Sequence, residues 1–255
     1  MSSPEGRDRF RDRLLFALSF MTRFPVPARV HEAEMPSFLG AFPLLIIGLF
    51  LGGVLAAADW LPVVLSWPMP PFLTAFLLLG LWIFLTGALH LDGLADTLES
   101  ALAPVSPEEK RRIRKDPRKG VYAIVALNLL LLGKWIGLLL ATPGPAAVFL
   151  APLLSRGFLP LLFRLLSRGR PAPEGGLGSL LSGSGWGAPL AAAILGILAA
   201  FGAGGIRGGV SALILFSGLL LVGSGVLKRS DGLSGDLAGF LVEGGETAFL
   251  LLLSL

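Results

Sequence analysis

The chain has 255 residues, of which 54% are hydrophobic and only 15% are charged, and it carries a net charge of +4 and no cysteine. A soluble protein of this length needs far more charged surface, so the composition predicts an all-α, polytopic membrane protein. The absence of cysteine excludes disulfides and thiolate metal sites, and basic residues that flank apolar segments argue against nucleic-acid binding.

The first 37 residues are predicted to form a cytoplasmic tail and a helix at the membrane interface. Residues 1–13 are rich in arginine, and the apolar segment 14–20 is too short to cross a bilayer. Arg23 and the prolines that follow it end this segment. Residues 38–60 are long enough for a first membrane span, which takes about 20 residues.

Residues 72–89 form a second predicted span, which leads directly into three acidic residues. Asp92, Asp96 and Glu99 fall at positions i, i+4 and i+7, so a continuing helix presents all three carboxylates on one face. Like charges in this arrangement repel one another, and a divalent cation relieves the repulsion. Oxygen ligands with positions left for phosphate are typical of Mg²⁺. The alternative is a solvated helix start with acidic residues near its N-terminus.

The segment 91–120 is the longest polar connection and carries a dense cluster of basic residues around Asp116. The cluster consists of Lys110, Arg111, Arg112, Arg114, Lys115, Arg118 and Lys119. In a membrane protein, such a cluster is first of all a signal for the cytoplasmic side. Because arginine forks pair well with phosphate, a nearby metal ion and these basic residues would together form a pyrophosphate clamp.

Five further spans are predicted at residues 121–141, 146–166, 186–204, 209–227 and 237–255. With seven spans and a cytoplasmic N-terminus, nearly all loop arginines and lysines fall on the cytoplasmic side, as the positive-inside rule requires. The polar loops 91–120, 167–185 and 228–236 share that side. The sequence therefore predicts one membrane domain, 1–255, whose bundle comprises residues 38–255.

Charged residues also occur at the start of the last span and inside the spans. Asp236 precedes the last span, where an N-cap is the simplest role, but Glu243 lies on the same face two turns later and Glu246 lies close by. Carboxylates inside a membrane are costly and need partners, which Lys134, Arg156 and Arg164 can supply. Two interpretations stay open: a purely structural ion-pair network, or a second acidic cluster that serves a metal site.

Two carboxylate clusters on one aqueous side, a basic clamp and a lipid-embedded scaffold indicate transfer at a phosphate or pyrophosphate. His90 is a candidate general base, although a single histidine at a helix end is more often a hydrogen-bonded bystander. One alternative is another intramembrane transferase of the prenyltransferase type, which also combines aspartates, Mg²⁺ and pyrophosphate. The other is a transporter, which would concentrate its charges at mid-span rather than at one membrane face.

Several segments, taken in order along the chain, form a distinctive pattern. They are F-M-T-R-F-P-V-P from Phe20, L-H-L-D-G-L-A-D-T from Leu89, K-D-P-R-K-G from Lys115 and G-D at Gly235, with single matches at Lys134, Arg156, Gly239, Glu243 and Glu246. The second segment is long enough to be specific. In this pattern the chain resembles the adenosylcobinamide-GDP ribazoletransferase family, also called cobalamin 5′-phosphate synthase.

The resemblance implies a Mg²⁺-dependent enzyme of a bacterial or archaeal inner membrane that acts in the last steps of cobalamin synthesis. The expected reaction joins α-ribazole, or α-ribazole 5′-phosphate, to adenosylcobinamide-GDP and releases GMP. Together with the charge pattern, the resemblance predicts metal ligands at Asp92, Asp96, Glu99, Asp116, Asp236 and Glu243. The predicted substrate-binding residues are Arg23, Lys115, Arg118 and Arg156, and the predicted catalytic residues are His90, Arg118, Lys134 and Arg156.

The chain departs from the family pattern at a few positions. Glu99 stands where Asp is usual, which keeps the charge but lengthens the side chain. Pro117 and Val121 stand where hydroxyl residues are common, so hydroxyl contacts to phosphate are not expected there. Asp231 occupies a usual glycine position, which argues against a ligand role for it. The sequence leaves open which ribazole substrate is preferred and whether the chain forms a homo-oligomer.

Overall fold

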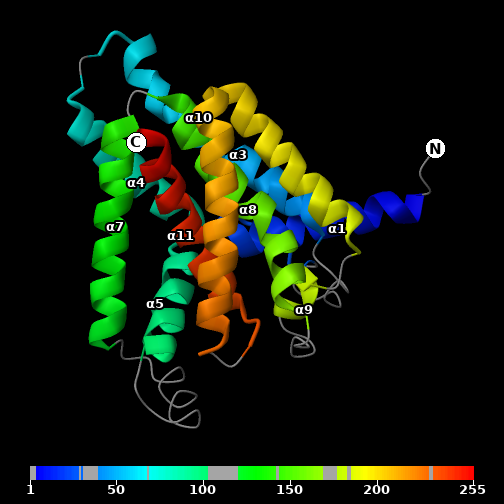
Figure 1. Ribbon diagram of the computed structural model, residues 1–255. Coiled ribbons are helices and arrows are strands. Elements are labelled where there is room, and N and C mark those ends of the chain that lie inside the picture. Colours follow the sequence, from blue (N-terminus) through cyan, green and yellow to red (C-terminus); the bar gives the residue numbers. More distant parts are fainter. Residues whose placement is uncertain are drawn as a thin grey trace.

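The computed structural model describes residues 4–28, 30, 40–67, 69–102, 120–141, 144–168, 177–182, 185–229 and 232–255. Over these residues the chain forms helices and no strand, which confirms the predicted all-α fold (Figure 1). The core is formed almost entirely by leucine, alanine and phenylalanine side chains of the long helices.

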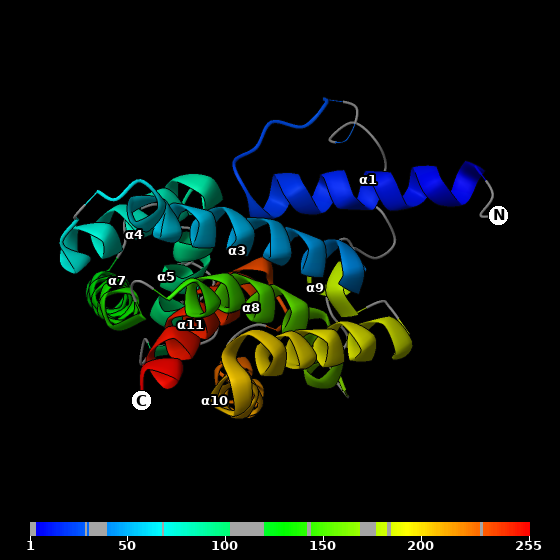
Figure 2. The same cartoon turned by 90° about the horizontal axis from the view of Figure 1, so that it is seen from above.

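Helix α1 (Pro4–Met21) lies alongside α3 (Ala41–Val64), as Figure 2 shows from above. The helix α1 is longer than the predicted apolar segment, because it begins within the arginine-rich tail; its place at the membrane interface stays a prediction. The first predicted span ended too early, since α3 continues through Pro62. A proline in the last turn removes one hydrogen bond of the helix without ending it.

The second span does not continue straight into the acidic segment. Helix α4 (Pro71–Thr86) and helix α5 (Leu89–Leu102) are separated by a bend of 88°. The break begins at Gly87, whose φ of 64° is in the left-handed region that commonly ends a helix, and Ala88 follows with a φ of 59°. The predicted loop 91–120 therefore begins with a helix. Asp92, Asp96 and Glu99 still share one face, because all three lie within α5.

Helix α8 (Pro145–Leu166) is the most buried of the long helices and lies between α3 and α10 (Figure 2). It also packs against α11 (Gly235–Ser254), which in turn contacts α5 and α7 (Val121–Ala141). The α7–α8 turn is held by α3, because the backbone N–H of Gly144 donates a hydrogen bond of 3.0 Å to the buried Asp59 carboxylate.

Helix α10 (Gly187–Leu227) follows the short helix α9 (Leu177–Ser182), which lies in the predicted loop 167–185. Non-helical backbone at Gly205 divides α10, and Figure 1 shows its yellow first half rising to a turn and its orange second half descending. The two halves correspond to the predicted spans 186–204 and 209–227. Gly205 allows the turn because its φ is 61°.

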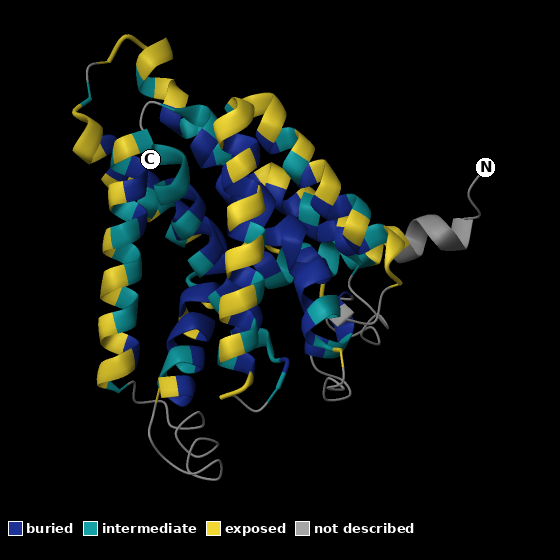
Figure 3. Ribbon diagram, in the orientation of Figure 1, coloured by how far each residue is buried: buried dark blue, intermediate teal, exposed yellow. Residues whose placement is uncertain are grey.

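Within the described residues, five helices are long and apolar enough to span a membrane, or six when α4 and α5 count as one. The helix α10 counts once in this total, although Gly205 divides it. Figure 3 shows that the outer faces of α7 and α10 are exposed, and side chains such as Leu129 and Leu221 on these faces are apolar. Apolar outer faces are suited to lipid, so the chain is a multi-pass membrane protein. The predicted seven spans and cytoplasmic N-terminus stay predictions.

Candidate active site

Helices α5 and α11 pack closely at two glycines. A Cβ atom added at Gly93 would lie 3.0 Å from the Cα atom of Asp236, and one added at Gly239 would lie 2.9 Å from the carbonyl oxygen of His90. Only glycine allows two helix backbones to approach this closely. The contact places the α5 backbone at Gly93, next to Asp92, against the first turn of α11, where Asp236 lies.

Asp92, Asp96 and Asp236 form what we call the acidic site. Asp92 is exposed, and the other two are half-buried. The simplest role predicted for Asp236 is a helix N-cap, but the N-cap of α11 is Ser234, whose hydroxyl accepts a 3.2 Å hydrogen bond from the N–H of Leu237. A capping role therefore does not account for Asp236.

The donor chemistry of the acidic site fits Mg²⁺, which binds carboxylates together with water and substrate phosphates. Among the described residues, however, no group of three or more histidine, aspartate or glutamate side chains is close enough to hold a metal ion. Asp116, a further predicted ligand, lies outside the described residues, as do Lys115 and Arg118 of the predicted clamp. The metal site and the clamp stay predictions.

Glu99 also belongs to the predicted metal ligands, and the structure gives it a structural contact. Its Oε1 atom accepts a 2.7 Å hydrogen bond from the backbone N–H of Gly120, at the start of α7. The side chain thereby joins the end of α5 to the helix that follows the basic segment.

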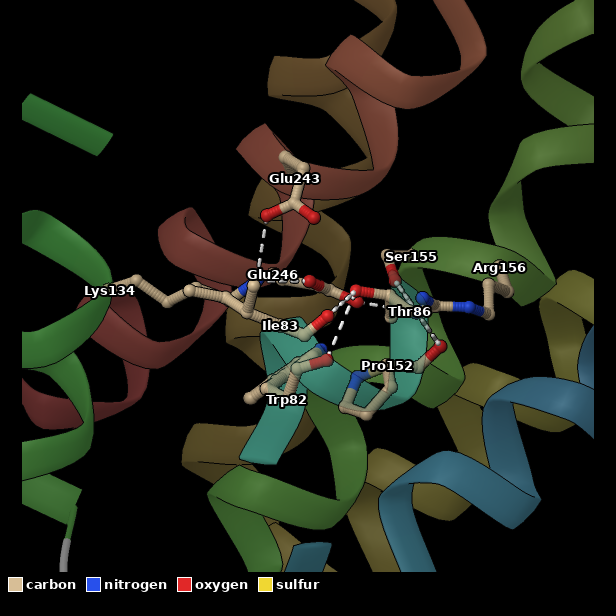
Figure 4. A network of polar contacts seen from close by, with 9 residues as sticks. All are labelled: Trp82, Ile83, Thr86, Lys134, Pro152, Ser155, Arg156, Glu243 and Glu246. Carbon is tan, nitrogen blue, oxygen red and sulfur yellow. Dashed lines mark hydrogen bonds and ion pairs between the residues drawn. The ribbon is translucent and has the colours of Figure 1, made fainter. Parts of the chain in front are cut away.

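Deeper in the bundle, four charged side chains form a second group, the buried charge cluster, which is shown in Figure 4. Lys134 donates hydrogen bonds to Glu243 at 2.8 Å and to Glu246 at 2.5 Å. Arg156 donates to the other oxygen of Glu246, also at 2.5 Å. All four residues are at most 2% exposed, and they join α7, α8 and α11.

The surroundings of the buried charge cluster are only partly polar. The Lys134 ammonium lies 4.2 Å from the centroid of the Trp82 ring, a cation–π contact that reaches α4. Arg156 also donates to the Ser155 hydroxyl at 3.3 Å. Its Nε and Nη2 atoms, like Nε2 of His90, are buried without a hydrogen-bond partner in the described part of the chain.

The buried charge cluster supports the ion-pair interpretation of the charges inside the spans. It contains two predicted catalytic residues, Lys134 and Arg156, and the predicted metal ligand Glu243. Glu243 is two turns from Asp236, roughly 10 Å along α11. The predicted site residues did not include Glu246, which is central here, or Trp82. The spacing of Glu243 and Glu246 indicated that Glu246 lies near Glu243, whereas no pattern indicated the contact of Trp82.

Arg23 and His90 lie where the N-terminal motif meets the α4–α5 break. The backbone N–H of Arg23 donates a 2.8 Å hydrogen bond to the carbonyl of Leu85, and its side chain packs over Gly87. The His90 ring is buried, 6.3 Å from the ring of Phe20. The exposed Arg23 is thus placed beside the helix that carries Asp92 and Asp96, whereas His90 is enclosed.

A bundle of long apolar helices with paired charges in its interior belongs to the class of helical membrane proteins. The sequence profile of the cobalamin-5-phosphate synthase family matches residues 13–254. Three similar proteins are each named adenosylcobinamide-GDP ribazoletransferase. The protein of Pseudomonas paraeruginosa is 39% identical over 257 residues, which cover 95% of this chain and 97% of the relative.

The second relative, from Stutzerimonas stutzeri, is 40% identical over 251 residues, with the same coverage of 95% and 97%. The third, from a Roseiflexus species, is 35% identical over 249 residues, covering 94% of this chain and 88% of the relative. No solved structure matches the chain. The chain therefore belongs to the cobalamin-5-phosphate synthase family, and it is a transferase of cobalamin synthesis.

Proposed function

We propose that the chain is a Mg²⁺-dependent adenosylcobinamide-GDP ribazoletransferase of the inner membrane. It would join α-ribazole, or its 5′-phosphate, to adenosylcobinamide-GDP and release GMP. Membership of the family and the names of the relatives support this reaction. The structural observation that supports the proposal is the close packing of α5, which carries Asp92 and Asp96, on the first turn of α11 at Gly93 and Gly239.

The release of GMP fixes which bond must break. A ribose hydroxyl of the ribazole attacks the phosphorus on the cobinamide side of the pyrophosphate and forms a new P–O bond. The bond from this phosphorus to the bridging oxygen breaks, and GMP leaves with that oxygen. The hydroxyl proton passes to water or to a basic group. Negative charge therefore grows on the phosphoryl oxygens and on the leaving phosphate, and the site must supply positive charge there.

The acidic site supplies that charge indirectly. Asp92, Asp96 and Asp236 would hold the cation, with Asp116 as a candidate fourth ligand. When bound, Mg²⁺ neutralises charge on the phosphates and orients them. The exposure of Asp92 and the half-burial of Asp96 and Asp236 support this role, because a ligand that arrives from water must reach them.

Basic residues would bind the pyrophosphate itself. Arg118 and Lys115 are proposed for this role from their motif, and Arg23 from its exposed place at the α4–α5 break. A planar guanidinium fork pairs with two phosphate oxygens at once, so the two arginines would orient the pyrophosphate as well as neutralise part of its charge.

Lys134, Arg156 and His90 are proposed to position the helices rather than to contact substrate. Lys134 and Arg156 are buried and ion-paired with glutamates of α11, which supports a structural role for their charges. His90 is 2% exposed and packs against α11 through its backbone at Gly239, which supports the same interpretation.

The test uses the purified protein in detergent with adenosylcobinamide-GDP. We expect GMP to appear only when both α-ribazole and Mg²⁺ are added, and a comparison of α-ribazole with its 5′-phosphate identifies the preferred substrate. GMP release that needs no ribazole would mean hydrolysis rather than transfer. Equal release after chelation of divalent cations would contradict the metal dependence.

A further inference from the structure

Arg164 in the last turn of α8 and Arg168, two residues beyond its end, stack on the tryptophan that precedes α10. The guanidinium carbon of Arg164 lies 5.1 Å from the centroid of the Trp186 ring, and that of Arg168 lies 4.8 Å from it. The arginines are one helical turn apart in sequence, and Trp186 immediately precedes the first residue of α10. Stacking on one ring holds two positive charges close together, which like charges otherwise oppose.

The surroundings of this arginine–tryptophan site are apolar and outward-facing. Trp186 is 40% exposed, Arg168 is exposed and Arg164 is half-buried. From Trp186 an exposed strip continues along α10 at every fourth residue. It consists of Leu190, Ile194 and Leu198. Figure 2 shows this half of α10 at the edge of the bundle, with α8 on its inner side. An exposed apolar strip on a membrane-spanning helix is suited to contact with acyl chains.

We propose that the arginine–tryptophan site binds the headgroup phosphate of an anionic phospholipid, with an acyl chain of the same lipid along the strip. Planar guanidinium groups pair with phosphate oxygens, and two that stack on one ring can contact the same phosphate. The site lies on the side that the charge distribution predicts to be cytoplasmic, where anionic lipids attract basic residues.

A soluble phosphate compound offers the same charge to the two arginines. It has no chain to cover the apolar strip, and the strip begins directly at Trp186. The continuity of guanidinium groups, indole ring and apolar residues therefore favours a lipid over a nucleotide. A bound lipid would join α8 to α10 at the end of the bundle where α9 also packs against α8.

The experiment measures the melting temperature of the purified protein in a neutral detergent during titration with phosphatidylglycerol. We expect a saturable rise, because a ligand that binds only the folded state stabilises it. The double variant R164Q/R168Q should weaken the apparent lipid affinity on the order of tenfold or more, since each basic residue near a lipid surface contributes about 1 kcal/mol. Trp186→Leu keeps both charges and an apolar side chain, and it should weaken binding severalfold.

The matched control is R207Q/K228Q, which also removes two exposed positive charges from α10 and its C-terminal end. Its melting temperature should rise with added phosphatidylglycerol as that of the wild type does. Because Trp186→Leu changes one half-exposed side chain, it decides the outcome even if the arginine variant does not fold. The proposal is overturned if phosphatidylcholine stabilises the wild type equally, or if the Trp186 variant and any folded arginine variant titrate like the wild type. It is also overturned if GMP competes with phosphatidylglycerol at these residues.

Discussion

The acidic site and the buried charge cluster both use carboxylates of α11, but they lie in different surroundings. The cluster balances two cations with two anions inside the bundle, and its members are at most 2% exposed. The acidic site consists of carboxylates of α5 and α11 at exposed and half-buried positions. Asp236 and Glu243 thus lie two turns apart on one helix. Asp236 is half-buried in the first turn, and Glu243 is in the interior of the bundle.

The difference shows how burial assigns a role to a charge. A carboxylate removed from water needs a partner within the protein, because an uncompensated charge inside a bilayer is expensive. A carboxylate that water can reach is able to bind a cation that arrives with the substrate. We therefore expect substitutions in the acidic site to reduce turnover, and substitutions in the cluster to reduce stability.

The largest effect is expected for Asp92→Asn and Asp96→Asn. Each removes charge that a divalent cation needs, so turnover should fall on the order of a hundredfold or more. Asparagine keeps the size of the side chain, and the melting temperature should change little. Mg²⁺-dependent GMP release and thermal unfolding measure the two quantities. Near-normal turnover in both variants would remove the acidic site from the mechanism.

Next in size is Glu246→Gln, which leaves Lys134 and Arg156 with too little negative charge. Breaking a buried ion pair from one side typically costs about 3–5 kcal/mol of folding free energy. The paired variant K134M/E243L removes one charge of each sign and retains the Arg156–Glu246 pair, so it should cost less. Both are compared by unfolding in detergent. A Glu246→Gln protein as stable as the wild type would show that the cluster does not hold the helices together.

A smaller effect is expected for Gly239→Ala, at the contact that brings the two helices of the acidic site together. The added Cβ would meet the carbonyl oxygen of His90 at 2.9 Å, and such overpacking typically costs about 1–3 kcal/mol. Turnover should fall as well, because α5 must move. Gly244→Ala on the same helix is the control, since nothing lies within 4 Å of its added Cβ. Equal stability and turnover of the Gly239→Ala and Gly244→Ala variants would argue against the close contact between α5 and α11.

The smallest effect is expected for Glu99→Asp, which keeps the charge and restores the residue usual in the family. The shorter side chain weakens the hydrogen bond to Gly120, at a cost of about 1 kcal/mol. Turnover should stay close to that of the wild type. A loss as large as that of Asp92→Asn would instead make the reach of Glu99 essential to the metal site.

The sequence predicts the features that depend on composition and helical periodicity. Long apolar segments indicate the membrane helices, and the register of Asp92, Asp96 and Glu99 follows from their spacing. The need of Glu243 for a cation inside a span also indicates Lys134 as a partner.

Features that depend on tertiary packing are not visible in the sequence. The break at Gly87 reflects local backbone conformation, and the apolar residues around it read as one continuous span. The closeness of Gly93 to Asp236 arises only when α5 packs on α11. Trp82 gives no signal because an indole in an apolar span is ordinarily a core residue, and its contact with Lys134 joins separate helices.

The most direct test of the division between the two regions is divalent-cation binding without turnover. Mn²⁺, as a spectroscopic substitute for Mg²⁺, is titrated into the wild type, Asp96→Asn and K134M/E243L, and bound metal is measured by electron paramagnetic resonance. We expect Asp96→Asn to weaken binding on the order of tenfold or more, since a carboxylate ligand is lost. The paired cluster variant should bind Mn²⁺ like the wild type. Unchanged binding by Asp96→Asn, or loss of binding in K134M/E243L, would contradict the assignment of the metal to the acidic site.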